Sequence, residues 1–185
     1  MKKIIMILVM VLTITNLQAY SYAAAGKEPT IDAKEQITKA MNEDNFKEAL
    51  KIFKENEKNY KYLTKEFIPS LYAGLEISIQ NKDKKQTIKN LELSLAAEIQ
   101  RRIDGGLQNI KTYNVAKVMV LKAKKFYNLL AVSLDKKNNK KLESAINNCI
   151  RAIGNPGLFG VGSKPANKND YIKNQKIIIE VIQSL

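Results

Sequence analysis

Residues 107–134 read LQNIKTYNVAKVMVLKAKKFYNLLAVSL, and this stretch decides the fold class. Apolar side chains recur along it three or four residues apart, which is the spacing of an α-helix rather than of a strand. The recurring residues are Val115, Val118, Met119, Leu121, Ala123, Phe126, Leu129, Leu130 and Leu134. Because they leave only a narrow polar stripe, we expect a central helix with neighbours on several sides.

The polar stripe of this segment consists of lysines, namely Lys117, Lys122, Lys124 and Lys125. A run of charges along a helix usually marks a solvent-exposed face, and we interpret the stripe in this way. Its alternative is a cationic contact surface, for which Lys124 is a candidate residue.

Helical spacing continues on both sides of the segment, and no strand alternation is seen. Helices are expected over residues 30–41, 45–60, 63–80, 84–103, 142–153 and 170–182. Asn45 should cap the second of these, and Pro69 should kink the third or mark its true first turn. Gly105-Gly106 should end or bend the fourth helix, and KKNNKK at 136–141 should be a polar turn. The predicted fold class is all-α, with six to seven helices.

The N-terminus has the order of a secretory signal peptide. Two lysines at positions 2 and 3 precede an apolar run over residues 4–14, and small residues follow up to Ala25. The run is too short to span a membrane, and no Cys near the cleavage region could carry a lipid anchor. We predict a cleavable signal peptide over residues 1–25, a single all-helical domain over 26–185, and export to the periplasm or the extracellular space.

The composition excludes several kinds of chemistry. The chain has no His, no Trp and one Cys, so it cannot form a His-dependent catalytic triad, an imidazole metal site or an internal disulfide. No metal-binding spacing of acidic residues is present. ATP and nicotinamide cofactors are not normally available outside the cytoplasm, so we expect no cofactor. Cys149 falls on an apolar helical stripe, and we predict that it is buried in the core.

Positive charge is concentrated in the second half of the chain. The formal net charge is +13; residues 27–104 carry 15 basic and 14 acidic residues, whereas residues 105–185 carry 14 and 4. Two interpretations stay open, an electropositive face and a compositional drift toward lysine. An exported lysine-rich surface favours anionic envelope partners, such as lipid head groups or wall polymers, over nucleic acid.

Three pairs of segments resemble tetratricopeptide-repeat helical hairpins. Residues 45–53 (NFKEALKIF) are similar to the second helix of such a repeat; residues 71–75 with 87–88, and 126–131 with 142–146, are similar to hairpins. The resemblance covers about half of the mature chain. Ala49, Ile88 and Ala145 lie 39 and 57 residues apart, not at the repeat period of about 34 residues. An irregular helical bundle is therefore the alternative architecture.

The resemblance implies a protein-interaction scaffold rather than an enzyme. Such arrays bind partner segments on the concave face formed by their first helices. The candidate contact residues for such a face are Tyr72, Glu76, Tyr113 and Lys117, none of which matches a specific contact of the family.

Residues 154–169 form the one loop-rich stretch, with four of the eight Gly and two of the four Pro. Its GLFGVGSK segment superficially resembles a phosphate-binding loop, but the order after Gly162 is wrong and no strand precedes it. Leu158 and Phe159 are expected to plug the core. Alternatively, they form a lid or an apolar tip for a partner or a membrane surface.

The first functional hypothesis is an exported, non-catalytic helical scaffold that binds an envelope protein or peptide. The second is an electrostatic binder of an anionic envelope polymer or membrane surface, and the third is a small-ligand-binding protein with a pocket under the 154–169 loop. A wall hydrolase that uses Glu76 or Glu92 is the least favoured, since both carboxylates should be half-exposed on their helices.

Overall fold

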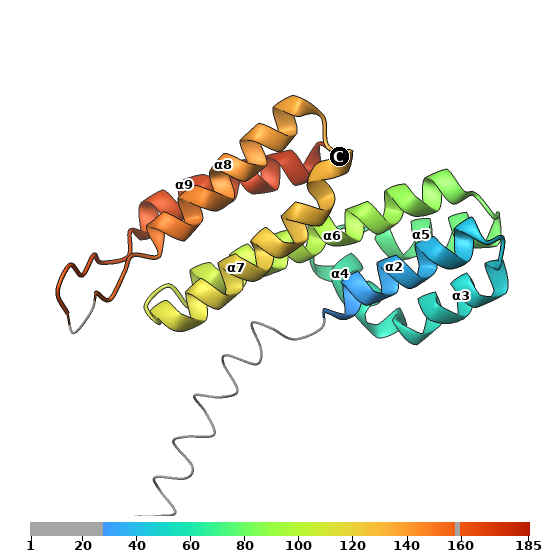
Figure 1. Cartoon of the computed structure of the whole chain (residues 1–185), viewed down its shortest axis with the longest axis horizontal. Helices are drawn as coiled ribbons and strands as arrows, with labels where there is room; N and C mark the ends of the chain where they lie inside the picture. The colour runs from blue at the N-terminus through green and yellow to red at the C-terminus, as the bar shows by residue number, and fades with distance from the viewer. Residues whose placement is uncertain (1–27, 158–159) are drawn as a thin grey trace, which may run out of the picture.

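The structure is a computed structural model of the chain, and it describes residues 28–157 and 160–185. Within these residues the fold is all-α, without strands (Figure 1). The helices are α2 (Pro29–Asn42), α3 (Phe46–Glu55), α4 (Glu57–Glu66), α5 (Leu71–Gln80), α6 (Lys84–Gln108), α7 (Tyr113–Leu130), the 3-10 turn η1 (Ala131–Ser133), α8 (Lys136–Ala152) and α9 (Lys168–Gln183). The all-α prediction is confirmed, with eight α-helices in the described chain rather than six or seven. The predicted signal peptide over residues 1–25, and Leu158 and Phe159, lie outside the described residues.

Residues 45–80 form three helices where two were expected. Asn45 caps α3 as predicted, since its side chain accepts a hydrogen bond from the Glu48 amide at 3.2 Å. The chain then breaks at Asn56, whose side-chain amide donates to the Ile52 carbonyl at 2.9 Å. Pro69 lies in the turn between α4 and α5, because a proline cannot donate the backbone hydrogen bond that a continuous helix would need there.

Gly105 and Gly106 do not end the helix that was predicted over residues 84–103. This helix is α6, and it continues through both glycines to Gln108. Gly106 is buried against α9, where the Tyr171 hydroxyl donates a hydrogen bond to the Ile103 carbonyl at 2.9 Å. A side chain at position 106 would collide with that hydroxyl. Close packing of the tyrosine thus requires a glycine at this position, whatever its helix propensity.

The KKNNKK segment is not a turn; it forms the first turns of α8. Asp135 caps this helix, because its carboxylate accepts hydrogen bonds from the amides of Lys137 at 2.8 Å and Asn138 at 3.0 Å. The prediction placed the helix start at the first apolar residue, Leu142. The true start lies six residues earlier, since an aspartate cap can begin a helix whose first turns are solvent-exposed.

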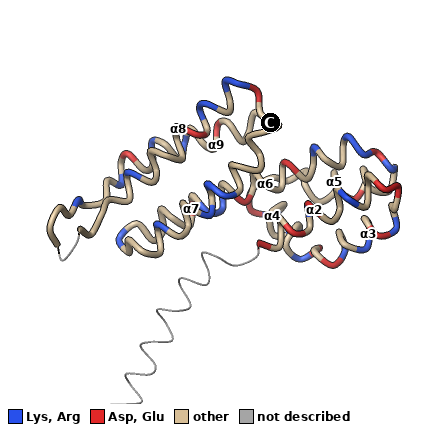
Figure 2. Tube along the Cα trace, viewed as in Figure 1, with Lys and Arg blue, Asp and Glu red and all other residues tan. Residues whose placement is uncertain are grey.

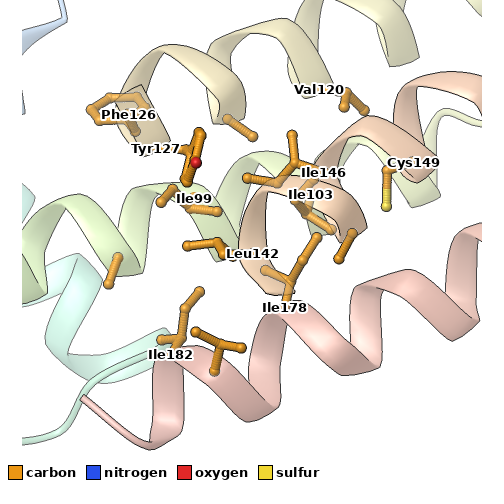
Figure 3. Packing of buried hydrophobic residues seen from close by; sticks show 14 of the residues in the cluster. Ile99, Ile103, Val120, Phe126, Tyr127, Leu142, Ile146, Cys149, Ile178 and Ile182 are labelled. Atoms are coloured by element: carbon orange, nitrogen blue, oxygen red, sulfur yellow. The ribbon is translucent and has the colours of Figure 1, made fainter. Parts of the chain in front are cut away.

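Two hydrophobic clusters make up the core, and α6 belongs to both. One cluster joins α2, α3, α4, α5 and the beginning of α6. The other joins the rest of α6 with Ile31 of α2 and with α7, α8 and α9, and Figure 3 shows its packing. Cys149 is fully buried in this second cluster, as predicted. The central helix is therefore α6 and not the 107–134 segment, whose α7 exposes Leu121 and Leu129 on its outer side.

Short connections make neighbouring helices pack in pairs. Helix α2 packs on α3, α5 on α6 and α7 on α8, so the helices assigned to the predicted hairpins do lie side by side. The most extensive pairs are α6 with α7 and α8 with α9, and α9 turns back to pack on α6. The second half of the molecule is therefore a bundle around α6 and not one further step of a uniform stack.

A group of buried charges lies where the two clusters meet. Glu28, at the start of α2, is bound by Arg102 of α6 at 2.7 Å and by Lys122 of α7 at 2.8 Å. Arg102 also lies 3.5 Å from Glu98, whose carboxylate accepts a hydrogen bond from the Thr30 hydroxyl at 2.9 Å. The cluster ties α2, α6 and α7 together.

Candidate binding surface in the C-terminal half

The candidate contact residues on α5 are occupied by neighbouring side chains. The Lys54 ammonium donates to the Tyr72 hydroxyl at 2.9 Å and pairs with the Glu76 carboxylate at 2.5 Å. The Tyr72 hydroxyl donates in turn to Glu57 at 2.7 Å. The hydrogen bond to Glu76, and secondarily that to Tyr72, raises the pKa of Lys54. Tyr72 and Glu76 therefore link α3, α4 and α5 to one another.

The other three described candidates lie on α7, against the second core cluster. The Lys117 ammonium lies 5.5 Å from the centre of the Tyr113 ring. Lys124 donates to the side-chain carbonyl of Asn147 at 2.8 Å and so joins α7 to α8. Figure 1 places α5 and α7 in different parts of the molecule, so the candidates predicted for one concave face do not come together.

The charge asymmetry of the sequence is also present in the folded molecule. Eight basic side chains of residues 28–104 lie within 4.0 Å of a carboxylate. Of the 14 basic residues in the range 105–185, only Lys122 has such a partner among the described residues. Figure 2 shows mixed charges around α2–α5 and mainly basic residues along α7 and α8. The excess charge of the second half is thus carried by basic side chains, all but Arg151 lysines, that have no carboxylate within 4.0 Å in the described chain.

The lysines of α7 and of the beginning of α8 differ in how accessible they are. Lys122 is held at Glu28 in the buried cluster, and Lys124 is partly covered by α8. Lys117 and Lys125 are exposed on the outer side of α7. Four more exposed lysines follow at the beginning of α8: Lys136, Lys137, Lys140 and Lys141. The single stripe expected along the 107–134 helix therefore divides into two structural lysines and two accessible ones.

A pocket of about 630 Å³ lies beneath the 154–169 loop. The loop is closed by two backbone hydrogen bonds between Asn155 and Lys164, at 2.8 and 2.7 Å. Gly154 and Gly157 have positive φ angles and lie so close to the returning chain that a side chain would collide with it. Closure of the loop brings Lys164 and Lys168 near the start of α7.

Tyr113 is the one aromatic residue among the described side chains that line this pocket. Three lysines also line it, namely Lys111, Lys164 and Lys168. No acidic residue of the described chain lines it. Tyr113 and the loop were predicted from the sequence, but the three lysines were not, since only the folded loop brings them together. The small-ligand hypothesis stays a prediction.

Three observations bear on metal and covalent chemistry in the part of the chain that the structure describes. No group of three or more His, Cys, Asp and Glu side chains in residues 28–157 and 160–185 is placed to hold a metal ion. Burial raises the pKa of the Cys149 thiol to about 12, which disfavours the reactive thiolate. Glu76 and Glu92 are both half-buried, and Glu76 is paired with Lys54.

Two further observations concern membranes and relatives. None of the described helices is both long enough and apolar enough to cross a bilayer. Comparison of the chain with protein-family models, with curated proteins and with solved structures finds no significant match.

Proposed function

We propose that this protein is an exported, non-catalytic binding protein, and that its C-terminal half engages an anionic polymer or membrane surface of the cell envelope. The observation that carries this proposal is the set of exposed lysines in residues 105–185 that have no carboxylate partner among the described residues. Charges without internal partners remain available to an external one, and their summed field attracts anions. Export rests on the N-terminal signal pattern alone.

The alternative is a scaffold that binds an envelope protein or peptide, as the tetratricopeptide resemblance implies. It receives less support, because Tyr72 and Glu76 are engaged by Lys54 and lie apart from Tyr113 and Lys117. Hydrolysis of wall polymers by Glu76 also receives little support. An ion-paired carboxylate lacks the apolar surroundings that hold a general acid protonated at neutral pH.

The test measures binding of residues 26–185, which include every described helix, to inorganic polyphosphate as a soluble polyanion. One variant replaces the four lysines at the start of α8 by Gln (Lys136, Lys137, Lys140 and Lys141). The matched control replaces four lysines of the N-terminal half that are also exposed and have no carboxylate within 4.0 Å among the described residues (Lys47, Lys58, Lys85 and Lys89).

Both variants lose the same formal charge, so a difference between them reports where the charge acts. We expect the α8 variant to bind polyphosphate at least about tenfold more weakly in low salt, and the control to bind within about twofold of the unmodified protein. Binding of the unmodified protein should weaken steeply as salt is added. Equal losses in the two variants, or binding that salt does not weaken, would contradict the proposal.

A further inference from the structure

The outer side of α7 exposes apolar side chains that the fold leaves uncovered. Leu121, Leu129 and Val132 are 44%, 37% and 89% exposed. They make up three of the six large hydrophobic residues that are exposed in the described chain. They lie eight and three residues apart, so they fall on one side of α7 and of the turn η1 that extends it. We call these three residues the α7 outer stripe. In Figure 1, α7 runs along the lower edge of the C-terminal half.

The charges around the α7 outer stripe are of one sign. Lys117 and Lys125 lie on the same side of the helix, one turn from Leu121, and both are exposed. No Asp or Glu occurs anywhere between Gly105 and Leu134. A solvent-exposed face normally mixes charges of both signs with few leucines. Leucine and valine interleaved with lysine suit a surface that lies in a membrane interface, because the apolar side chains can enter the bilayer while the lysine stems extend to the head groups.

We infer that the α7 outer stripe is a membrane-binding surface, and that it docks on a bilayer that contains anionic phospholipid. This inference rests on the proposed function and selects one of its two partners. Lysines 117 and 125 attract the lipid head groups, while their long aliphatic stems lie beside the apolar stripe. Leu121, Leu129 and Val132 enter the boundary between head groups and acyl chains. A soluble polyanion offers no apolar phase, so it gives these three residues nothing to bind.

The first experiment uses vesicles and polyphosphate in parallel, with residues 26–185. Vesicles contain equal amounts of phosphatidylglycerol and phosphatidylcholine, or phosphatidylcholine alone. The triple variant Leu121→Ser, Leu129→Ser, Val132→Ser removes the apolar side chains and leaves every lysine in place. The matched control is Ile77→Ser, which removes a side chain that is 56% exposed on α5 in the N-terminal half. Thermal melts confirm that each variant is folded.

We expect the unmodified protein to bind the anionic vesicles and to bind the neutral ones at least about tenfold more weakly. The triple variant should bind anionic vesicles at least about tenfold more weakly than the unmodified protein, yet bind polyphosphate within about twofold of it. The Ile77 control should match the unmodified protein in both assays. Vesicle binding that survives the triple substitution would overturn the inference.

The second experiment uses the absence of tryptophan from the chain. Val132→Trp places a single fluorophore on the α7 outer stripe, and Ile77→Trp places one on α5 as the control. We expect the emission of the first variant to move to shorter wavelength with anionic vesicles and to be quenched by brominated lipid, with no change for the control. Polyphosphate binding without vesicle binding would overturn this inference and leave the proposed function standing. Loss of both would overturn both.

Discussion

At the scale of single residues, the pair Gly105-Gly106 shows how little the residue type says about its role. Both glycines are inside α6, where glycine is about 1 kcal/mol less favourable than alanine. A β-carbon at Gly105 would touch only the flexible Met119 side chain, at 3.4 Å from its sulfur. A β-carbon at Gly106 would collide with the Tyr171 hydroxyl, which is fixed by its hydrogen bond to Ile103.

We therefore predict opposite signs for two neighbouring substitutions. Gly105→Ala should stabilise the protein by about 0.5–1 kcal/mol, since alanine lowers the backbone entropy that the unfolded chain loses on folding. Gly106→Ala should destabilise it by about 1–3 kcal/mol, because a close-packed core does not yield to an inserted methyl group. Urea unfolding followed by circular dichroism measures both values, and each variant is the control for the other. Equal shifts of the same sign would contradict the assigned role of Tyr171.

At the scale of elements, α8 depends on one side chain at its start. Asp135 satisfies two amides of the first turn, and these backbone hydrogen bonds lower the pKa of its carboxyl below the ordinary value of 3.8. Asp135→Ala should cost about 1 kcal/mol at pH 7. The control is Glu143→Ala, which removes the same charge from an exposed position inside α8, and it should change stability by less than about 0.5 kcal/mol.

The stabilisation by Asp135 should also depend on pH in a definite direction. Because the folded-state pKa is lowered, the folded protein binds fewer protons than the unfolded chain, so the contribution of the cap is complete above pH 3.8. It is lost as the pH falls through the lowered pKa. The difference in unfolding free energy between the unmodified protein and Asp135→Ala should shrink accordingly. A difference that grows toward acid pH would contradict this assignment.

Element boundaries were the least predictable part of the fold, and the physical reason is visible in these caps. Apolar periodicity located the buried faces of the helices, because buried side chains follow the 3.6-residue repeat. It missed the break at Asn56, and it placed the end of α6 at Gly105-Gly106 rather than at residues 109–112. It could not locate the start of α8, whose first turns bury nothing. The lysines of the candidate surface were countable in the sequence. The sequence does not show which of these lysines are accessible, because Lys122 forms an ion pair with Glu28, a residue distant in the chain.

At the scale of the whole molecule, the two core clusters meet at the buried charges around Arg102. The Arg102 side chain is 11% exposed and bridges two carboxylates that are almost wholly buried, those of Glu28 and Glu98. Such a cluster adds little net stability compared with apolar packing, but removing one member leaves an opposite charge buried without its partner. When Arg102 is replaced, Lys122 still pairs with Glu28, and Arg101 still lies 3.2 Å from Glu98. These two cations compensate only part of the lost interaction with Arg102.

Arg102→Met should therefore destabilise the protein by about 3 kcal/mol and lower the melting temperature by roughly 6–12 °C. Arg102→Lys keeps the charge but cannot bridge both carboxylates with a planar fork, so its loss should be intermediate. Lys65→Met is the control, since it removes the exposed ion pair with Glu66, and its cost should stay below about 0.5 kcal/mol.

Differential scanning calorimetry is the right measurement, because α2 and α7 are both held to α6 through this cluster. If the cluster couples the two cores, the Arg102→Met transition should broaden or split while the control melts in one step. A sharp transition at the unmodified temperature would show that apolar packing alone joins the two halves.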